Sequence, residues 1–413
     1  MDRNKFAVAA IFKNELPFIV EWLAYHRVLG ISRFFIADNE SDDGTAQLLQ
    51  ALSVAGYVEC ITYKTVPDVK PQLAAYQLLM DTFKDKADWF CFIDADEFMR
   101  PSSRATNVIN SLDGVLGDEK VGAVAVNWAV YGSSNWVTAN SKGVIERFFS
   151  RGVRERGVNR HYKTIVRSSA YKDVGTNPHV FEINDQFVYA DPSGRYLEVG
   201  ELGGLTDDVN WDVVRVNHYV VKSRSEFFTK KRPRGRPNGS LRPVEFFSQH
   251  DMNDEDDAFS SDFLELVREE KSLIYKALKE RAGYVCGNLN YSDSDLFFAA
   301  KNPALKICVD AVNLSAKKVE CKGWVIGDGG ENVDFKMLVD YKDVVRASRV
   351  DRMIRPDVVS AYKLDPEFRY GFVCTFDIAV DAADEKEAPL IELCVGVGRQ
   401  NLGAIISLAS KMK

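Results

Sequence analysis

The sequence predicts an α/β domain with a mainly parallel sheet, then a helical linker, then a small all-β, sandwich-like domain. The first third alternates short apolar strands with amphipathic helices, a pattern typical of βαβ units whose sheet is covered on both faces. From Leu305 onward, short alternating runs recur between turn signals such as Gly327-Asp328-Gly329-Gly330, which predicts a β-sandwich. We place the three parts at residues 1–250, 251–302 and 303–413.

The elements of the first part follow from apolar spacing and from turn residues. Pro17 opens a helical pattern that Gly30 ends, and Gly56 closes the second helix. Strands are predicted over 6–12, 33–37, 58–63 and 89–93, and helices over 17–29, 45–55 and 72–83.

The remaining segments are predicted in the same way. Residues 121–219 are rich in strand patterns and turns. A helix is predicted over 258–281, with a shared apolar face formed by Phe263, Leu266, Val267, Ile274 and Leu278. In the last part we predict strands over 305–312, 318–326, 335–340, 371–378 and 390–397.

Composition excludes several classes of protein. A formal net charge of -7 over 413 residues gives no support for nucleic-acid binding. The seven cysteines include no CxxC pair, so we expect reduced thiols rather than a zinc site or disulfides. No leader pattern precedes the first strand, and no apolar run approaches the ~20 residues that span a bilayer. We therefore expect a cytoplasmic protein, and peripheral contact with the inner face of the membrane is compatible with this.

The most informative motif is FIDADEF, residues 92–98. A buried strand ends there in Asp94, Asp96 and Glu97, and such a concentration of negative charge is costly without a cation. Asp94 and Asp96 project to the same side of extended backbone, so they could share a hard divalent ion through oxygen ligands. The motif predicts metal-dependent handling of a phosphate-bearing substrate, best matched by a nucleotide-sugar.

Polar residues also follow the other strands of the predicted sheet. Asn14 and Glu15 follow the first strand, and Asp38 follows the second. Ligands of such sheets bind beyond the carboxyl ends of the strands, so these residues are expected to converge with the carboxylates. A helix cap or an Asx-turn is the alternative for them. Lys70 and Gln72 precede a helix facing the same cleft, and either could contact ribose or phosphate.

A cationic segment follows His218. Its charged members are Lys222, Arg224, Lys230, Lys231, Arg232, Arg234 and Arg236, and interspersed prolines and glycines predict a loop at its end. We expect Lys230, Arg232 and Arg234 to contact a diphosphate, because guanidinium forks suit phosphate oxygens. A solvated charge run or a patch for acidic lipids is the alternative.

Four segments in order carry a family resemblance: IFKNELPFIVEWLAYHRVLG, FFIADNESDDGT, FCFIDADEF and NHYVVKSRSEFFTKKRPRG. They resemble the bacterial family-2-like glycosyltransferases related to family 92, over about residues 6–236. The resemblance implies the GT-A fold, a Rossmann-like catalytic domain. It implies that Asp94 and Asp96 form the DxD pair that holds Mn²⁺ or Mg²⁺ against the donor diphosphate. It also implies that His218 is a third metal ligand or a diphosphate contact, and that Asn14, Glu15 and Asp38 hold the uracil and ribose.

The acceptor side is inferred by the same analogy. Asn127, Trp128 and Tyr131 lie where GT-A enzymes build the acceptor cleft, although a tryptophan is also a common core residue. An inverting transferase needs a general base. His179 is best placed for this role by analogy, Asp191 is next, and Glu97 is a further candidate. Lys163 and Arg167 match a family segment to which we assign no role.

Together these features predict a metal-dependent glycosyltransferase. It would move a hexose from a UDP-sugar donor to a saccharide or glycolipid acceptor hydroxyl, with inversion, in cell-envelope polysaccharide synthesis. One alternative is a nucleotidyltransferase, which usually needs a glycine-rich loop where this chain has KNELP. The other is a carbohydrate-binding protein with a degenerate transferase domain.

Overall fold

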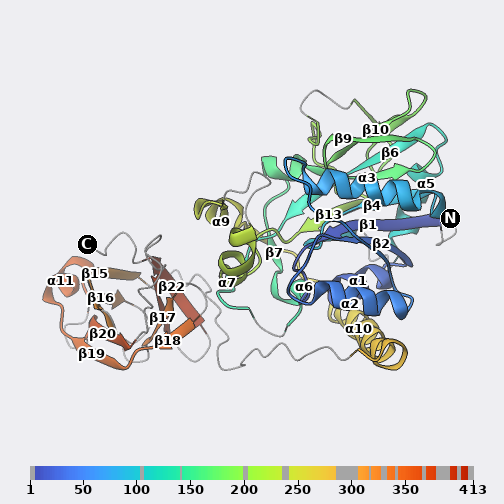
Figure 1. Cartoon of the computed structure of the whole chain (residues 1–413). Coiled ribbons are helices and arrows are strands. Elements are labelled where there is room, and N and C mark those ends of the chain that lie inside the picture. The colour runs from blue at the N-terminus through green and yellow to red at the C-terminus, as the bar shows by residue number, and fades with distance from the viewer. Residues whose placement is uncertain are drawn as a thin grey trace. The chain divides into compact units, whose positions relative to one another are not determined.

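The chain folds into two compact units in its computed structural model (Figure 1). The first unit comprises residues 1–132, 142–220 and 250–290, and the second comprises 133–141, 221–249 and 291–413. The structure describes residues 5–102, 107–139, 142–198, 203–234, 241–284, 306–315, 318–326, 333–339, 343–364, 369–377, 391–397 and 401–407. Each unit is treated separately below.

The first unit is built on one large sheet with the order β12-β11-β6-β8-β4-β1-β2-β3. The strands are β1 (Phe6–Phe12), β2 (Arg33–Asp38), β3 (Glu59–Thr62), β4 (Trp89–Phe92), β6 (Val121–Val130), β8 (Tyr162–Arg167), β11 (Val188–Ala190) and β12 (Tyr196–Leu197). The four strands β1 to β4 are mutually parallel, whereas β8 is antiparallel to both of its neighbours, β4 and β6. The carboxyl ends of β1, β2 and β4 therefore meet at one edge of the sheet.

Helices cover both faces of this sheet (Figure 1). They are α1 (Ile19–Val28), α2 (Thr45–Val54) and α3 (Pro71–Phe83), and a fourth helix, α10 (Ser261–Ala282), packs on α1 and α2. Gly30 has a φ of 91°, which favours glycine and ends α1 as predicted. The helix α10 packs on α1 through the Arg27–Glu270 ion pair. Its predicted apolar face is confirmed at Val267, Ile274 and Leu278, but Leu266 is 42% exposed and lies outside that buried face.

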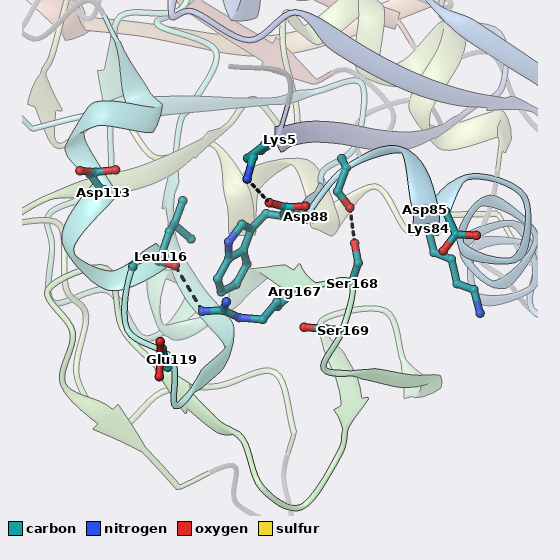
Figure 2. Close-up of a pocket in the computed structure, with 13 residues that line it drawn as sticks. Lys5, Lys84, Asp85, Asp88, Asp113, Leu116, Glu119, Arg167, Ser168 and Ser169 are labelled. Atoms are coloured by element: carbon teal, nitrogen blue, oxygen red, sulfur yellow. Dashed lines mark hydrogen bonds and ion pairs between the residues drawn. The ribbon is translucent and has the colours of Figure 1, made fainter. Parts of the chain in front are cut away.

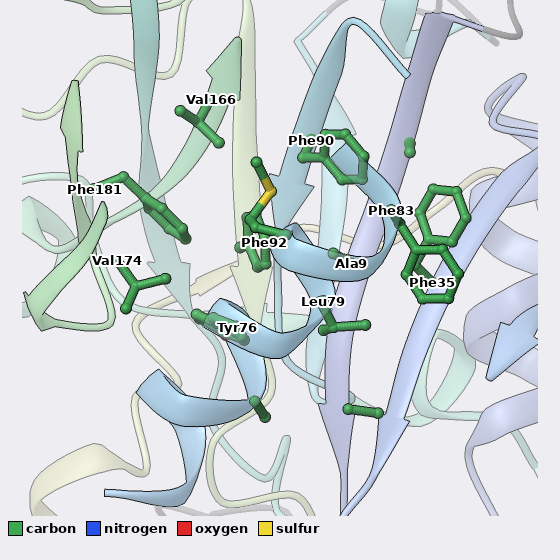
Figure 3. Close-up of a cluster of buried hydrophobic side chains, with 14 of the residues drawn as sticks. Ala9, Phe35, Tyr76, Leu79, Phe83, Phe90, Phe92, Val166, Val174 and Phe181 are labelled. Atoms are coloured by element: carbon green, nitrogen blue, oxygen red, sulfur yellow. The ribbon is translucent and has the colours of Figure 1, made fainter. Parts of the chain in front are cut away.

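The core under α3 is predominantly aromatic (Figure 3). Phe35 and Phe90 from two parallel strands stack on each other, and Phe83 of α3 stacks on Phe35 at 4.5 Å. Tyr76 and Phe92 meet at 4.6 Å close to the end of β4. This packing fixes α3 against the strand that leads into the carboxylate motif.

Two further strands carry the other half of that motif. Strand β5 (Glu97–Pro101) runs antiparallel to β13 (Val214–His218), and β13 also runs parallel to the end of β6. In this register Glu97 lies opposite His218. The smaller elements of the unit are α4 (Val108–Ser111), α5 (Asp113–Leu116), α6 (Val144–Arg147), β7 (Ser150–Arg151), β9 (Tyr171–Asn177), β10 (Val180–Ile183) and β14 (Glu255–Asp256).

The second unit contains a β-sandwich. Its sheets have the orders β15-β16-β20-β19 and β18-β17-β21-β22. The strands are β15 (Lys306–Ser315), β16 (Lys318–Ile326), β17 (Val333–Val339), β18 (Asp343–Arg346), β19 (Arg349–Met353), β20 (Gly371–Asp377), β21 (Ile391–Val397) and β22 (Asn401–Ser407). Phe372 and Cys374 of one sheet share a core with Phe335 and Met337 of the other, as expected of a sandwich. The helix α11 (Pro356–Tyr362) was not predicted.

The predicted fold class is confirmed: an α/β domain with the GT-A arrangement of a mainly parallel sheet, and a C-terminal domain of antiparallel sheets. The domain boundaries at residues 250 and 303 stay a prediction. Within the described ranges, no helix has both the length and the apolar character needed to cross a membrane.

Candidate functional site

The carboxylates of FIDADEF are organised by a buried lysine that extends from the neighbouring strand. Lys163 of β8 places its Nζ 2.8 Å from Asp94 Oδ2 and 3.2 Å from Glu97 Oε2. Glu97 Oε2 also accepts the Asp94 backbone N–H at 2.8 Å. On its other side, Asp94 Oδ1 accepts hydrogen bonds from Gln72 and Tyr76.

Burial controls the electrostatics of this network. The side chains of Lys163 and Glu97 are 1% and 0% exposed. Burial raises the pKa of Glu97 to about 8, although the ammonium of Lys163 opposes that shift. Burial by itself would lower the pKa of Lys163, but Asp94 and Glu97 outweigh it and raise that pKa. The cluster is therefore a tightly held group of charges at the end of β4.

Asp96 and His218 have the geometry to hold a divalent cation. Asp96 Oδ1 lies 3.7 Å from His218 Nε2, wider than the distance of about 3 Å that separates neighbouring ligands of one Mn²⁺ or Mg²⁺, so a small closing movement would let both bind one ion. Within the described residues, no group of three or more His, Cys, Asp or Glu side chains is arranged to hold a metal. Magnesium commonly uses one or two carboxylates together with substrate phosphates and water, so these two residues fit a metal that a diphosphate completes.

Asp94 is held by hydrogen bonds from protein side chains, and its role as a metal ligand stays a prediction. Asp94 lies in the same cluster as Asp96, but both of its oxygens already accept hydrogen bonds or face Lys163. No local pattern identifies the lysine as a partner of Asp94, because the two residues are 69 positions apart and meet only through the pairing of β4 with β8.

The predicted nucleotide residues lie on two loops that are hydrogen-bonded together. The Asn14 N–H donates to Ser41, and Asn14 Oδ1 accepts from the Asp42 N–H. The Glu15 N–H donates to Thr45 Oγ1, which ties the loop after β1 to the start of α2.

These contacts identify which predicted residue has an unused polar atom. Asn14 has a structural bond on its side chain, whereas Asp38 Oδ1 is buried with no hydrogen-bond partner. The hydroxyl of Tyr63, just beyond β3, is also buried without a partner. Of the two helix-start residues, Gln72 bonds Asp94, and Lys70 donates to the Thr176 carbonyl.

Three histidines surround the indole of Trp128. Its ring centroid lies 4.3 Å from that of His218 and 5.0 Å from those of His161 and His179. Trp128 is partly exposed, and its Nε1 is an atom without a hydrogen-bond partner. We did not predict His161 at this site, although it lies only two residues before Lys163 on the same side of the strand.

His179 has a defined tautomer. Its Nδ1 lies 2.7 Å from the Tyr162 carbonyl, which can only accept, so Nδ1 carries the proton and Nε2 is an acceptor. Burial, reinforced by Lys163, lowers the pKa of His179 to about 3, which keeps the imidazole neutral. Neutral imidazole is the form that can accept a proton, although the low pKa also weakens it as a base.

Asp191 is used differently from the prediction. It is 2% exposed and accepts hydrogen bonds from the Ser193 and Arg195 backbones, the Arg195 guanidinium and Asn210. These bonds hold the turn between β11 and β12. No contact of this carboxylate with Asp94, Glu97 or His218 is seen in the described structure, and the geometry gives no support for its role as a base.

Two predicted acceptor residues are fully buried. Asn127 bonds Thr206 and the Asn210 backbone, and it is 0% exposed. Tyr131 is also 0% exposed, and its hydroxyl donates to Asp257. The side chains of Asn127 and Tyr131 therefore pack inside the protein around β6. Of the three predicted acceptor residues, only Trp128 is partly exposed.

Residues 224–234 of the cationic segment are helical, and the loop predicted at its end falls mainly on residues 235–240, outside the described residues. Ser223 and Glu226 form a capping box at the start of α7 (Arg224–Glu226), which continues into a π-helical turn, Phe227–Lys231, and α8 (Arg232–Arg234). Lys230, Arg232 and Arg234 lie on these turns in the second unit. Arg236 lies outside the described residues, and the role of this segment in binding a diphosphate stays a prediction.

Arg167 lies far from Lys163 although both are on β8. It lines a cavity of about 860 Å³ at the start of β4 (Figure 2), the opposite edge of the sheet from Asp94. Its guanidinium donates to the carbonyls of Leu116, Asp118 and Val121 and lies 4.4 Å over Trp89. These contacts are structural.

Comparisons with known proteins find similarity to one family of glycosyltransferases. Residues 6–195 match the sequence model of glycosyltransferase family 92. The family 92 protein At1g27200 of Arabidopsis thaliana is 30% identical over 172 residues, which are 40% of this chain and 29% of that protein. The family 92 protein Os08g0121900 of Oryza sativa subsp. japonica is 26% identical over 252 residues, 59% of this chain and 41% of that protein. The chain thus spans less than half the length of these two curated relatives.

Solved structures resemble the chain only loosely. S. aureus TarS is 11% identical, with a TM-score of 0.29, over 98% of this chain and 77% of that one. Glucosyl-3-phosphoglycerate synthase from Mycobacterium tuberculosis, in complex with Mg²⁺ and UDP, is 16% identical, with a TM-score of 0.23, over 30% of this chain and 44% of that one. The family match confirms the predicted resemblance to family 92, while its bacterial, family-2-like part stays a prediction.

Proposed function

We propose that this protein is a metal-dependent glycosyltransferase that transfers a hexose from a UDP-sugar to a saccharide hydroxyl. The observation that carries the proposal is the approach of Asp96 to His218 at 3.7 Å, beside the buried Asp94–Lys163–Glu97 network. The match of residues 6–195 to family 92 supports the same reaction class. A role in cell-envelope polysaccharide synthesis and inversion at the anomeric carbon belong to the same proposal.

On the donor side, each residue has a task that its contacts support. Asp38 Oδ1, buried without a partner, would accept a hydrogen bond from the uracil or ribose. Asp96 and His218 would hold Mn²⁺ or Mg²⁺, which supplies positive charge to the departing diphosphate. Lys163 fixes Asp94 and Glu97, so the residues that flank Asp96 are held before substrate binds.

On the acceptor side, Trp128 offers a partly exposed indole face between His218 and His179. An aromatic face of this kind can lie against the apolar face of a sugar ring. The Nε2 of His179, an acceptor in the tautomer present, would receive a hydrogen bond from the reacting hydroxyl. In this proposal the acceptor would lie beside the proposed metal ligand His218, whose ring lies 4.3 Å from that of Trp128.

The direct test measures UDP release from UDP-glucose, UDP-galactose and UDP-N-acetylglucosamine with Mn²⁺, and again after EDTA. We expect UDP release that is abolished by EDTA. Asp96→Asn and His218→Gln should each lower the rate of UDP release by at least about a hundredfold, because they remove stabilisation of the departing charge. Asp81→Asn, an exposed carboxylate on α3, is the matched control and should leave release unchanged.

The same assay separates the competing functions. A nucleotidyltransferase acting on a UDP-sugar would transfer UMP and release a sugar 1-phosphate rather than UDP. A binding protein would release neither product. Full turnover in Asp96→Asn would refute the proposed mechanism.

A further inference from the structure

A second cavity adjoins the acceptor side of the site. It measures about 650 Å³, within the range of 300–1,000 Å³ typical of ligand sites. Its walls come from β6, β8, β11 and β12 and from residues 203–208. Asp191 fixes the turn between β11 and β12, so one wall of the cavity is held in place by four hydrogen bonds to a single buried carboxylate.

The lining combines aromatic rings with charged groups of both signs. Tyr162 and Tyr189 are almost fully buried, whereas Tyr196 is 50% exposed. Two arginines, Arg160 and Arg195, are outnumbered by three carboxylates: Glu198, Asp207 and Asp208.

This chemistry selects among ligand classes. A phosphate or other anion would need an excess of positive charge, which the lining lacks. A purely apolar ligand would leave the charged groups without hydrogen bonds. A neutral molecule with many hydroxyls and one apolar face satisfies both conditions, because carboxylates accept, guanidinium groups donate and an exposed tyrosine ring can stack. A sugar unit has these properties.

The cavity shares its wall with the residues around Trp128. Tyr162 lines the cavity, and its carbonyl accepts the hydrogen bond that fixes His179. Leu205 also lines it and forms a β-bridge with His161, whose ring lies 5.0 Å from that of Trp128. The cavity is thus lined by residues whose backbones contact His179 and His161 beside the proposed reacting position.

We propose that this cavity binds the sugar unit next to the one that receives the transferred hexose, so that the preferred acceptors contain two or more sugar units. The inference rests on the proposed function, since it assigns a further part of the same acceptor. Tyr196 stacks on that second unit, and Asp208, which is 77% exposed, accepts a hydrogen bond from it.

The test uses the full chain with Mn²⁺ and UDP on a glycan array that displays mono- to tetrasaccharides. We expect binding to glycans of two or more units and at least about tenfold weaker binding to the matching monosaccharides, an amount in line with one stacked ring. Titration calorimetry with the best-binding glycan should then show that Tyr196→Ala lowers the affinity for that glycan about tenfold. Tyr196→Phe should keep the affinity, because it keeps the ring and loses only the hydroxyl that donates to Asp118. Tyr275→Ala, a comparably exposed tyrosine of α10, is the control and should bind as the unmodified chain does.

The two proposals fail in different ways. If UDP stabilises the protein against heat, but no glycan of two or more units binds better than its monosaccharide, this inference is overturned and the proposed function stands. Equal glycan affinity of Tyr196→Ala and the unmodified chain also overturns it. If UDP with Mn²⁺ does not bind at all, the proposed function fails first.

Discussion

Lys163→Met tests whether the buried lysine neutralises the carboxylates of the site. Removing one partner of a buried ion pair typically costs about 3–5 kcal/mol, because the other charge is left buried and uncompensated. Asp94 is 30% exposed and keeps its bonds from Gln72 and Tyr76, so most of the cost falls on Glu97, which is 0% exposed. We therefore expect the free energy of unfolding of the first unit, measured above pH 8 so that Glu97 is ionised, to fall by about 3–5 kcal/mol.

A second background isolates the electrostatic part. Glu97→Gln removes the charge but keeps an oxygen for the Asp94 N–H. In that background Lys163→Met should cost only about 1.5 kcal/mol, the value for one hydrogen bond to a charged group. The coupling of the two substitutions should thus be well above the ~0.5 kcal/mol expected of independent sites.

Urea unfolding followed by tryptophan fluorescence measures these values, since Trp22, Trp89, Trp128 and Trp211 all lie in the first unit. Lys172→Met is the control, because that side chain is 57% exposed and lies 3.9 Å from Glu182. It should change stability by less than about 0.5 kcal/mol. The reasoning would be refuted if Lys163→Met cost the same in both backgrounds.

Three further predictions follow from other parts of the chain. Asp257 forms ion pairs with Arg100, Arg151 and Arg215. Burial by itself would raise the pKa of Asp257, but Arg215 and Arg100 outweigh burial and lower that pKa. The ion pairs therefore stabilise the fold above the unfolded pKa of about 3.9, and this stabilisation is lost as pH falls through the folded pKa. Asp257→Asn should lower stability at neutral pH by about 3 kcal/mol and weaken the further loss in acid, and urea unfolding at several pH values would contradict this if both proteins lost stability in parallel. Gly323→Ala would press a Cβ onto the Cys308 carbonyl, so the free energy of unfolding of the β-sandwich, measured by thermal unfolding, should fall by about 1–3 kcal/mol. Gly114→Ala, which has open space around its Cβ, is the control and should leave that transition unchanged. Asp38→Ala should raise the Kd for UDP about tenfold or more in calorimetry through loss of one hydrogen bond to a charged group, and an unchanged Kd would show that Asp38 Oδ1 has no nucleotide partner.

The sequence by itself determined the elements and the edge where the site lies. Apolar spacing located β1 to β4 and the three helices between them, because each pattern is set by residues that are close along the chain. The rule that parallel strands end at one edge then placed Asp38 and Asp94 together before any contact was known.

Only the tertiary structure decided how those carboxylates are used. The antiparallel insertion of β8 beside β4 brings Lys163 to Asp94 and Glu97, and the pairing of β5 with β13 brings His218 to Asp96. The tertiary structure also buries Asn127 and Tyr131. The alternation of side chains along β6 could not by itself distinguish them from accessible residues of the same segment. The physical reason is that strand periodicity fixes which side a residue faces, whereas burial and charge pairing depend on which distant strand lies next to it.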